Sequence, residues 1–181
     1  MGLAINLIFC GIAFLTFAIS AGFLTDSVRR IGQIPNYSAN NHLKNAHYVG
    51  TIDAIVSWIV VALLLLAIVL YIIYGSETAE YTGSIFLYFV LLISLGGALT
   101  TGIIGAYIAY NINQSGVSDN NGSYKQAIVA TVLALITFTL LVILFLIKVF
   151  YKPKKKEKSG ENPDWFLSEI ENDPELAAEA I

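Results

Sequence analysis

Four long apolar segments limit what this 181-residue chain can fold into. Before Lys148, none of them contains Asp, Glu, Lys, Arg or His, and they cover residues 3–24, 54–74, 83–110 and 127–149. A helix rises about 1.5 Å per residue, so roughly 20 apolar residues cross the ~30 Å hydrocarbon core of a bilayer. An open chain in lipid satisfies its backbone hydrogen bonds only as helices. The sequence therefore predicts an all-α fold, a four-transmembrane-helix bundle within residues 1–151.

The composition favours lipid as the solvent. Hydrophobic residues make up 56% of the chain and charged residues 13%, whereas about 25% is charged in ordinary soluble domains. A soluble domain of this size buries only roughly 60–70% of its surface. The single cysteine, Cys10, excludes an intramolecular disulfide and a multi-cysteine metal site, and we expect it to be buried as a small apolar residue.

The first segment has a second reading, as a cleaved signal peptide with small residues at 18–21 as the cleavage site. Signal peptides begin with basic residues. Residues 1–6 contain no Lys or Arg. We therefore predict that the segment is retained as a membrane span.

Basic residues predict the orientation in the membrane. A lysine run follows the fourth segment directly: Lys152, Lys154, Lys155, Lys156 and Lys158. By the positive-inside rule both termini are cytoplasmic, and the 26–53 and 111–126 loops face the other side. Arg29, Arg30, Lys44 and Lys125 run against this prediction. The lysine run also predicts attraction to anionic headgroups, about 1 kcal/mol per Lys.

Residues 152–181 form a tail that is first basic and then acidic. Asn162-Pro163 and Asp173-Pro174 are typical of helix starts, and they predict short helices at 163–171 and 174–180. A partly disordered tail is the alternative. Trp165, Phe166 and Ile170 would form an apolar patch among acids, which is typical of docking to a protein partner.

The third segment contains two rows of small residues at four-residue spacing. Gly97, Thr101, Gly105 and Ala109 form the first row; Ala98, Gly102 and Ala106 form the second. Small residues at this spacing let helices approach closely in lipid. Two readings remain open: packing against the chain's own helices, or a face for another protein.

Few groups suit chemistry inside the membrane. Asp53 and Lys148 lie near segment ends, where we expect them at the interface, and this argues against proton relays and ion-coupled carriers. A hydroxyl-lined path is conceivable, but such hydroxyls usually bond to backbone carbonyls or neighbouring helices. It would include Ser94, Thr100, Thr101, Thr131, Thr137 and Thr139.

Other motifs are sparse. His42 and His47 lie near Asp53, but nothing fixes a metal geometry, so we expect no metal site. No nucleophile–base pattern or phosphate-binding loop occurs, and we expect neither an enzyme nor a cofactor. Asn-x-Ser sequons, which are possible N-glycosylation sites, begin at Asn36, Asn113 and Asn121, all within the two predicted outer loops.

The overall layout is that of a tetraspan protein, but the paired extracellular cysteines of tetraspanins and claudins are missing. Asn45-Ala46-His47, Thr51, Ala54 and the stretch 57–62 (Ser-Trp-Ile-Val-Val-Ala) lie within the first half of the chain. This part resembles small multi-span virion membrane proteins of large icosahedral DNA viruses. The resemblance implies a virion membrane beneath a capsid, with the tail or loops touching minor capsid proteins.

Together these features predict a non-enzymatic, multi-pass membrane scaffold. It would anchor a protein assembly to the lipid bilayer through its tail and loops, without a nucleic-acid partner. The alternative is a small channel or accessory transporter subunit that oligomerises through the third segment.

Overall fold

The computed structural model describes residues 2–74, 82–117 and 122–150, which form four long helices. These are α1 (Gly2–Gly32), α2 (Asn41–Tyr74), α3 (Thr82–Gln114) and α4 (Ser123–Phe150). A short 3-10 helix, η1 (Tyr37–Ala39), lies between α1 and α2. All four long helices are long and apolar enough to cross a membrane. The predicted all-α, multi-pass membrane fold is therefore confirmed.

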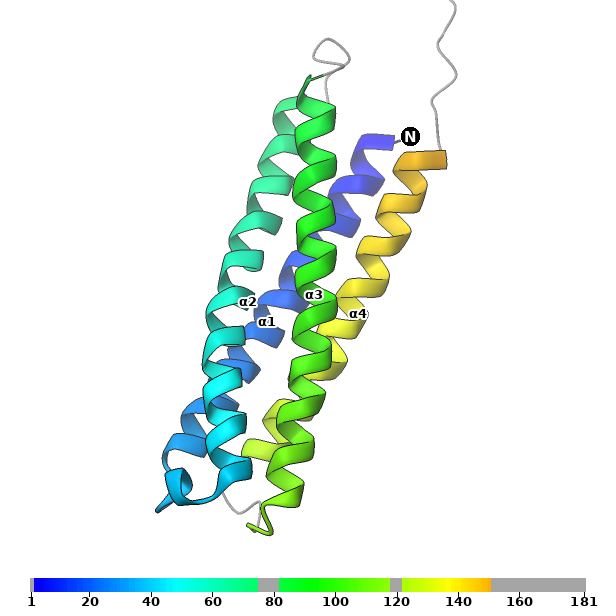
Figure 1. Ribbon diagram of the computed structural model, residues 1–181. Coiled ribbons are helices and arrows are strands. Elements are labelled where there is room, and N and C mark those ends of the chain that lie inside the picture. The colour runs from blue at the N-terminus through cyan, green and yellow to red at the C-terminus, as the bar shows by residue number, and fades with distance from the viewer. Residues whose placement is uncertain (1, 75–81, 118–121, 151–181) are drawn as a thin grey trace, which may run out of the picture. The chain divides into compact units, whose positions relative to one another are not determined.

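The four helices lie side by side with alternating directions (Figure 1). The N-terminal end of α1 and the C-terminal end of α4 lie at one end of the bundle, and the connection from α1 to α2 lies at the other. The helices contain 28 to 34 residues, so they are roughly 42–51 Å long. They therefore exceed the ~30 Å hydrocarbon core and extend into the headgroup region.

Most of the predicted first outer loop is helical. Helix α1 continues to Gly32, and α2 begins at Asn41 instead of residue 54. Asp26 pairs with Arg29 at 2.9 Å and with Arg30 at 2.6 Å, and such spacings stabilise a helix. The Asn40 side chain caps α2 by accepting hydrogen bonds from the backbone N–H groups of residues 42 and 43. Local side-chain bonds thus extend both helices beyond their apolar segments.

Each helix has a row of buried residues whose spacing alternates between three and four, the heptad pattern of coiled coils and four-helix bundles. In α1 this row is Cys10, Ala13, Phe17, Ser20, Leu24, Ser27 and Ile31, and Ala21 and Val28 are buried beside it. In α2 the row is Leu43, Ala46, Gly50, Asp53, Ser57, Val60, Leu64, Ala67 and Tyr71, and Ala54 and Leu70 are buried beside it. The same spacing runs from Leu87 to Ile112 in α3 and from Ser123 to Leu144 in α4.

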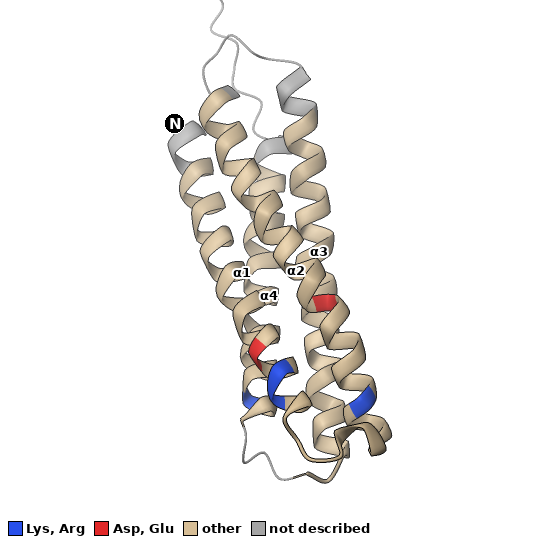
Figure 2. Cartoon of the chain, turned by 90° about the vertical axis from the view of Figure 1, so that its left-hand side faces the viewer, with Lys and Arg blue, Asp and Glu red and all other residues tan. Residues whose placement is uncertain are grey.

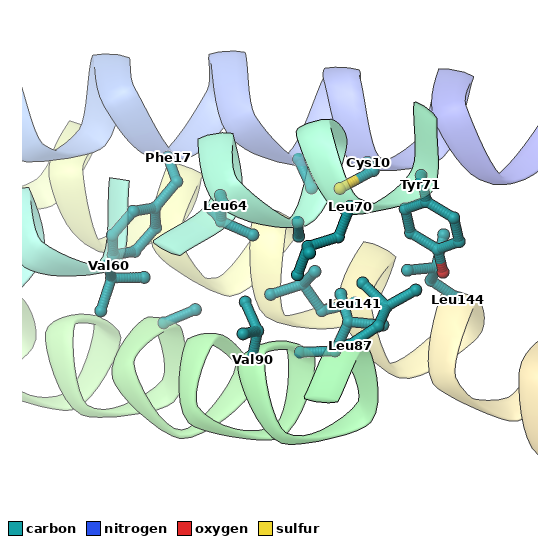
Figure 3. Packing of buried hydrophobic residues seen from close by; sticks show 14 of the residues in the cluster. Cys10, Phe17, Val60, Leu64, Leu70, Tyr71, Leu87, Val90, Leu141 and Leu144 are labelled. Atoms are coloured by element: carbon teal, nitrogen blue, oxygen red, sulfur yellow. The ribbon is translucent and has the colours of Figure 1, made fainter. Parts of the chain in front are cut away.

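The core consists of two apolar clusters. The larger lies toward the N-terminal end of α1 and contains the residues shown in Figure 3, among them Phe17, Leu64 and Leu141. The Cys10 side chain points into this cluster, so its predicted burial is confirmed. The smaller cluster lies toward the connection from α1 to α2 and includes Leu24, Leu43 and Ile108.

Three glycines of α3, Gly97, Gly102 and Gly105, face helices of the same chain. A Cβ atom on Gly97 would overlap Val60 Cγ2 of α2. Gly102 and Gly105 face α4. A Cβ atom on Gly102 would lie 2.9 Å from Leu135 Cδ2, and one on Gly105 would lie 2.5 Å from Thr131 Oγ1. These close approaches are possible because glycine has no side chain. The structure thus favours the first reading of the small-residue rows, packing against the chain's own helices.

The remaining small residues of the two rows divide between the interior and the surface. Ala98, Thr101 and Ala109 are buried, whereas Ala106 is exposed. The second row, which includes Ala106, therefore does not follow the interior along its whole length.

Two adjacent glycines allow a matched test of this packing. We expect Gly97→Leu to lower the free energy of unfolding by about 1–3 kcal/mol, because the added side chain has no room against Val60. Gly96 is exposed and has no neighbouring atom within 4 Å of an added Cβ. Gly96→Leu should therefore leave stability unchanged or raise it slightly through helix propensity. Unfolding in mixed detergent micelles measures both; equal losses would contradict the helix arrangement.

Candidate functional site

Asp53 is the most unusual side chain in the described part of the chain. It lies 12 residues after the start of α2, about 18 Å along the helix, and only 1% of it is exposed. We expected a carboxylate at the interface, but the structure encloses it within the bundle. The reason is that α2 begins before residue 54, which places Asp53 on the heptad face that packs against α3. A buried ionisable group in a membrane span is by default a candidate functional site.

Two hydroxyl groups form the surroundings of this carboxyl group. Thr101 Oγ1 of α3 donates a long hydrogen bond of 3.4 Å to Asp53 Oδ1. Thr101 Oγ1 also lies 2.9 Å from Ser57 Oγ, one turn after Asp53 on α2. Ser57 and Thr101 are fully buried. Asp53 Oδ2 is also buried and has no hydrogen-bond partner among the described residues. The arrangement leaves one carboxyl oxygen on which a proton can reside.

This group belongs to a polar layer between the two apolar clusters. The clusters leave a gap between Phe17 and Leu24 in α1 and between Ala54 and Val60 in α2. Ser20 fills the gap in α1 and donates a 2.7 Å hydrogen bond to the carbonyl of Ala130 in α4. Ser57 fills it in α2. The layer therefore consists of short hydroxyl side chains directed at neighbouring helices.

The seam between α1 and α4 continues on both sides of this layer. Thr16 Oγ1 lies 2.9 Å from Thr137 Oγ1, and Ser27 donates to the carbonyl of Ser123 at 2.9 Å. In a bilayer such interhelical bonds contribute about 0.6 kcal/mol on average and at most ~1.7 kcal/mol. Sequence reasoning missed Ser20 and Ser27. The signal that identifies them is their heptad spacing with Ala13, Phe17 and Leu24.

The hydroxyls considered as a conducting path mostly bond to backbone carbonyls, and that expectation is confirmed. Ser94, Thr100, Thr131, Thr137 and Thr139 each donate to the carbonyl four residues earlier, at 2.8–2.9 Å. Thr100 and Thr139 are exposed on the outer surface of the bundle. The six hydroxyls therefore do not form one continuous interior row.

The two histidines have separate partners. His42 Nδ1 lies 3.1 Å from Asn111 Oδ1 of α3, and the His47 ring packs against Tyr37 with ring centroids 4.8 Å apart. No group of three or more His, Cys, Asp and Glu suited to a metal occurs within residues 2–74, 82–117 and 122–150.

The charged side chains described by the structure gather in one half of the bundle, toward the connection from α1 to α2 (Figure 2). They are Asp26, Arg29, Arg30, Lys44, Asp53 and Lys125. The sequon residues Asn36 and Asn113 are exposed. Asn36 precedes η1, close to the connection, and Asn113 lies near the C-terminal end of α3.

Several predicted residues lie outside the described part of the chain. These are Asn121, the lysine run Lys152, Lys154, Lys155, Lys156 and Lys158, the patch Trp165, Phe166 and Ile170, and the two tail helices.

No family model, curated protein or solved structure matches the chain. Its function therefore has to be argued from its own residues and their geometry.

Proposed function

We propose that this protein is a non-enzymatic membrane scaffold that anchors a protein assembly to the bilayer. The observation that carries the proposal is that the bundle uses its small and hydroxyl side chains on its own helices. Gly97 packs on α2, Gly105 packs on α4, and Ser20 joins α1 to α4. Because these groups already contact the chain's own helices, we assign partner recognition to the segments outside the membrane.

The outward surface supports the same role. Large apolar side chains cover the outer faces of all four helices, with Ile8, Ile55 and Ile103 each about 60% exposed. Such a surface matches lipid hydrocarbon, and in water it would be an aggregation site. The described helices thus serve as an anchor that needs no further protein to cover them.

The recognition element in this proposal is the C-terminal tail. Trp165, Phe166 and Ile170 offer aromatic and aliphatic anchors among acidic residues, a composition suited to docking on a protein surface. The preceding lysine run would hold the tail close to anionic headgroups on the cytoplasmic side. The resemblance to virion membrane proteins makes capsid proteins the favoured partner and a virion membrane the favoured location.

Deletion of residues 164–181 tests this role. We expect the shortened protein to insert into membranes and keep its helical content, but to lose its co-purifying partner after extraction in mild detergent. The double variant Trp165→Ala/Phe166→Ala should lose most of the partner as well, and Ser168→Ala serves as its control. Unchanged partner recovery after the deletion would exclude the tail as the recognition element.

Asp53 favours a second candidate function, a small channel or an accessory transporter subunit. An enclosed carboxyl oxygen without a hydrogen-bond partner among the described residues is costly in lipid, and such groups commonly mark ion and proton pathways. In this reading the polar layer of Asp53, Ser57 and Thr101 binds the transported ion.

Flux through reconstituted liposomes tests this second function. If it is correct, the wild type conducts protons or Na⁺, and Asp53→Asn reduces the flux at least roughly tenfold, because the amide neither ionises nor binds a cation well. Asp26→Asn is the matched control, since Asp26 is ion-paired near the end of α1 and lies outside the layer. If the wild type shows no flux, or if both variants lose flux equally, the channel or transporter function is excluded and only the scaffold proposal remains.

A further inference from the structure

A groove of about 410 Å³ lies between α1 and α2. Helix α1 contributes Thr25, Val28 and Arg29 to it, and α2 contributes Thr51, Ile55 and Trp58 among others. We propose that this groove binds one anionic phospholipid, with an acyl chain between the helices and the phosphate on Arg29. The volume falls within the roughly 300–1,000 Å³ typical of small-molecule sites.

The groove is lined almost wholly by apolar atoms, and the register of the two helices places one of its ends beside the charged half of the bundle. Val28 faces Gly50 across the antiparallel pair, where an added Cβ would lie 2.6 Å from Val28 Cγ2. Arg29 and Thr51 therefore lie together toward the charged half of the bundle. Ile55 and Trp58 lie one and two turns after Thr51 on α2, about 6 and 10 Å further along the helix from the charged half of the bundle. A phospholipid has the same sequence of polar and apolar parts along its length.

Hydrogen bonds within the protein make the deep end of the groove suitable for hydrocarbon. The indole Nε1–H of Trp58 donates to Thr25 Oγ1 at 3.2 Å, and Thr25 Oγ1 donates to the carbonyl of Ala21 at 2.8 Å. The Thr51 hydroxyl donates to the carbonyl of His47 at 2.7 Å. The hydroxyl groups of the groove are thus bonded to the protein, which leaves methyl groups and ring faces toward the groove.

The charge beside this end of the groove favours an anion. One carboxylate, that of Asp26, lies between the guanidinium groups of Arg29 and Arg30, at 2.9 Å and 2.6 Å. The Arg29 side chain is 68% exposed, and a guanidinium has five N–H donors, of which the described bond to Asp26 uses one. Arginine matches phosphate oxygens well because two parallel N–H groups can bind them.

The surroundings favour a lipid over a soluble ligand or a protein. Ile55 is 61% exposed and Trp58 49% exposed, on a helix long and apolar enough to span the membrane. Tryptophan is enriched at membrane interfaces, where one edge of the ring meets hydrocarbon and the other meets polar groups. The molecules that meet this surface in a bilayer are phospholipids.

Native mass spectrometry of the full chain, purified from mixed vesicles, tests the site. Vesicles with equal amounts of phosphatidylglycerol and phosphatidylcholine provide the probes. We expect one retained phosphatidylglycerol per chain, favoured over phosphatidylcholine by about fivefold from a single cation at the surface. Arg29→Gln should abolish this preference. Lys44→Gln should retain it, because Lys44 belongs to the same charged half but does not line the groove.

A second pair of variants tests the groove itself. Thr51→Phe fills the end beside the charged half and should reduce retention of both lipids, whereas Thr100→Phe, at an exposed threonine away from the groove, should not. Equal retention of the two lipids by the wild type would overturn the proposal. Equal losses in Arg29→Gln and Lys44→Gln would also overturn it, since they would indicate diffuse attraction to the whole charged end. The readout does not involve the tail, so it is independent of the scaffold proposal.

Discussion

Hydrogen bonds between helices, made by short hydroxyl side chains, are the interaction on which this bundle depends. Hydrocarbon offers no partner to a polar group, so each serine or threonine that faces inward has to bond within the protein. Ser20 and Ser27 donate hydrogen bonds to backbone carbonyls of α4 and so hold α1 against α4. Ser57 and Thr101 do the same for α2 and α3. The close glycine contacts of α3 follow, because they need the helices to stay in this register.

The sequence alone predicts the four helices, because long uncharged segments have no other structure in lipid. It predicts the ends of these helices less accurately. The extension of α1 depends on ion pairs from Asp26, and the start of α2 depends on the cap by Asn40. Because the sequence prediction placed the start of the second span at residue 54, it also placed Asp53 in the interface. The structure shows that the same residue lies on the inward face of a longer helix.

The interior faces were only partly predictable, and the reason is physical. Membrane helices are apolar all round, so hydrophobic periodicity does not mark the buried side as it does in soluble proteins. In this chain the inward positions are marked instead by small and hydroxyl residues at heptad spacing. The rows of α3 are predictable because several small residues recur at a fixed spacing, whereas Ser20 and Ser27 are single hydroxyl residues seven positions apart and form no such row. The groove at Arg29 was not predictable, since it depends on the register in which α1 and α2 pack against each other.

Among the described residues, Asp53 has a buried carboxyl oxygen without a hydrogen-bond partner, and this group separates the two functional readings. A scaffold needs no buried carboxyl group, whereas an ion pathway does. Both functions nevertheless include the hydroxyl bond of the polar layer by which Thr101 of α3 joins Ser57 of α2. The hydrogen bonds of that layer therefore stabilise the bundle whichever function the protein has.

Thr101→Val, compared with Thr100→Val, tests this claim most directly, because both changes replace a hydroxyl by a methyl group. Thr101 bonds across to α2, whereas the exposed Thr100 bonds within its own helix to the carbonyl of Gly96. We predict that Thr101→Val lowers the free energy of unfolding in mixed micelles by about 1–2 kcal/mol and that Thr100→Val changes it by less than roughly 0.5 kcal/mol. Equal effects of the two variants would show that hydroxyl bonds between helices do not hold this bundle together.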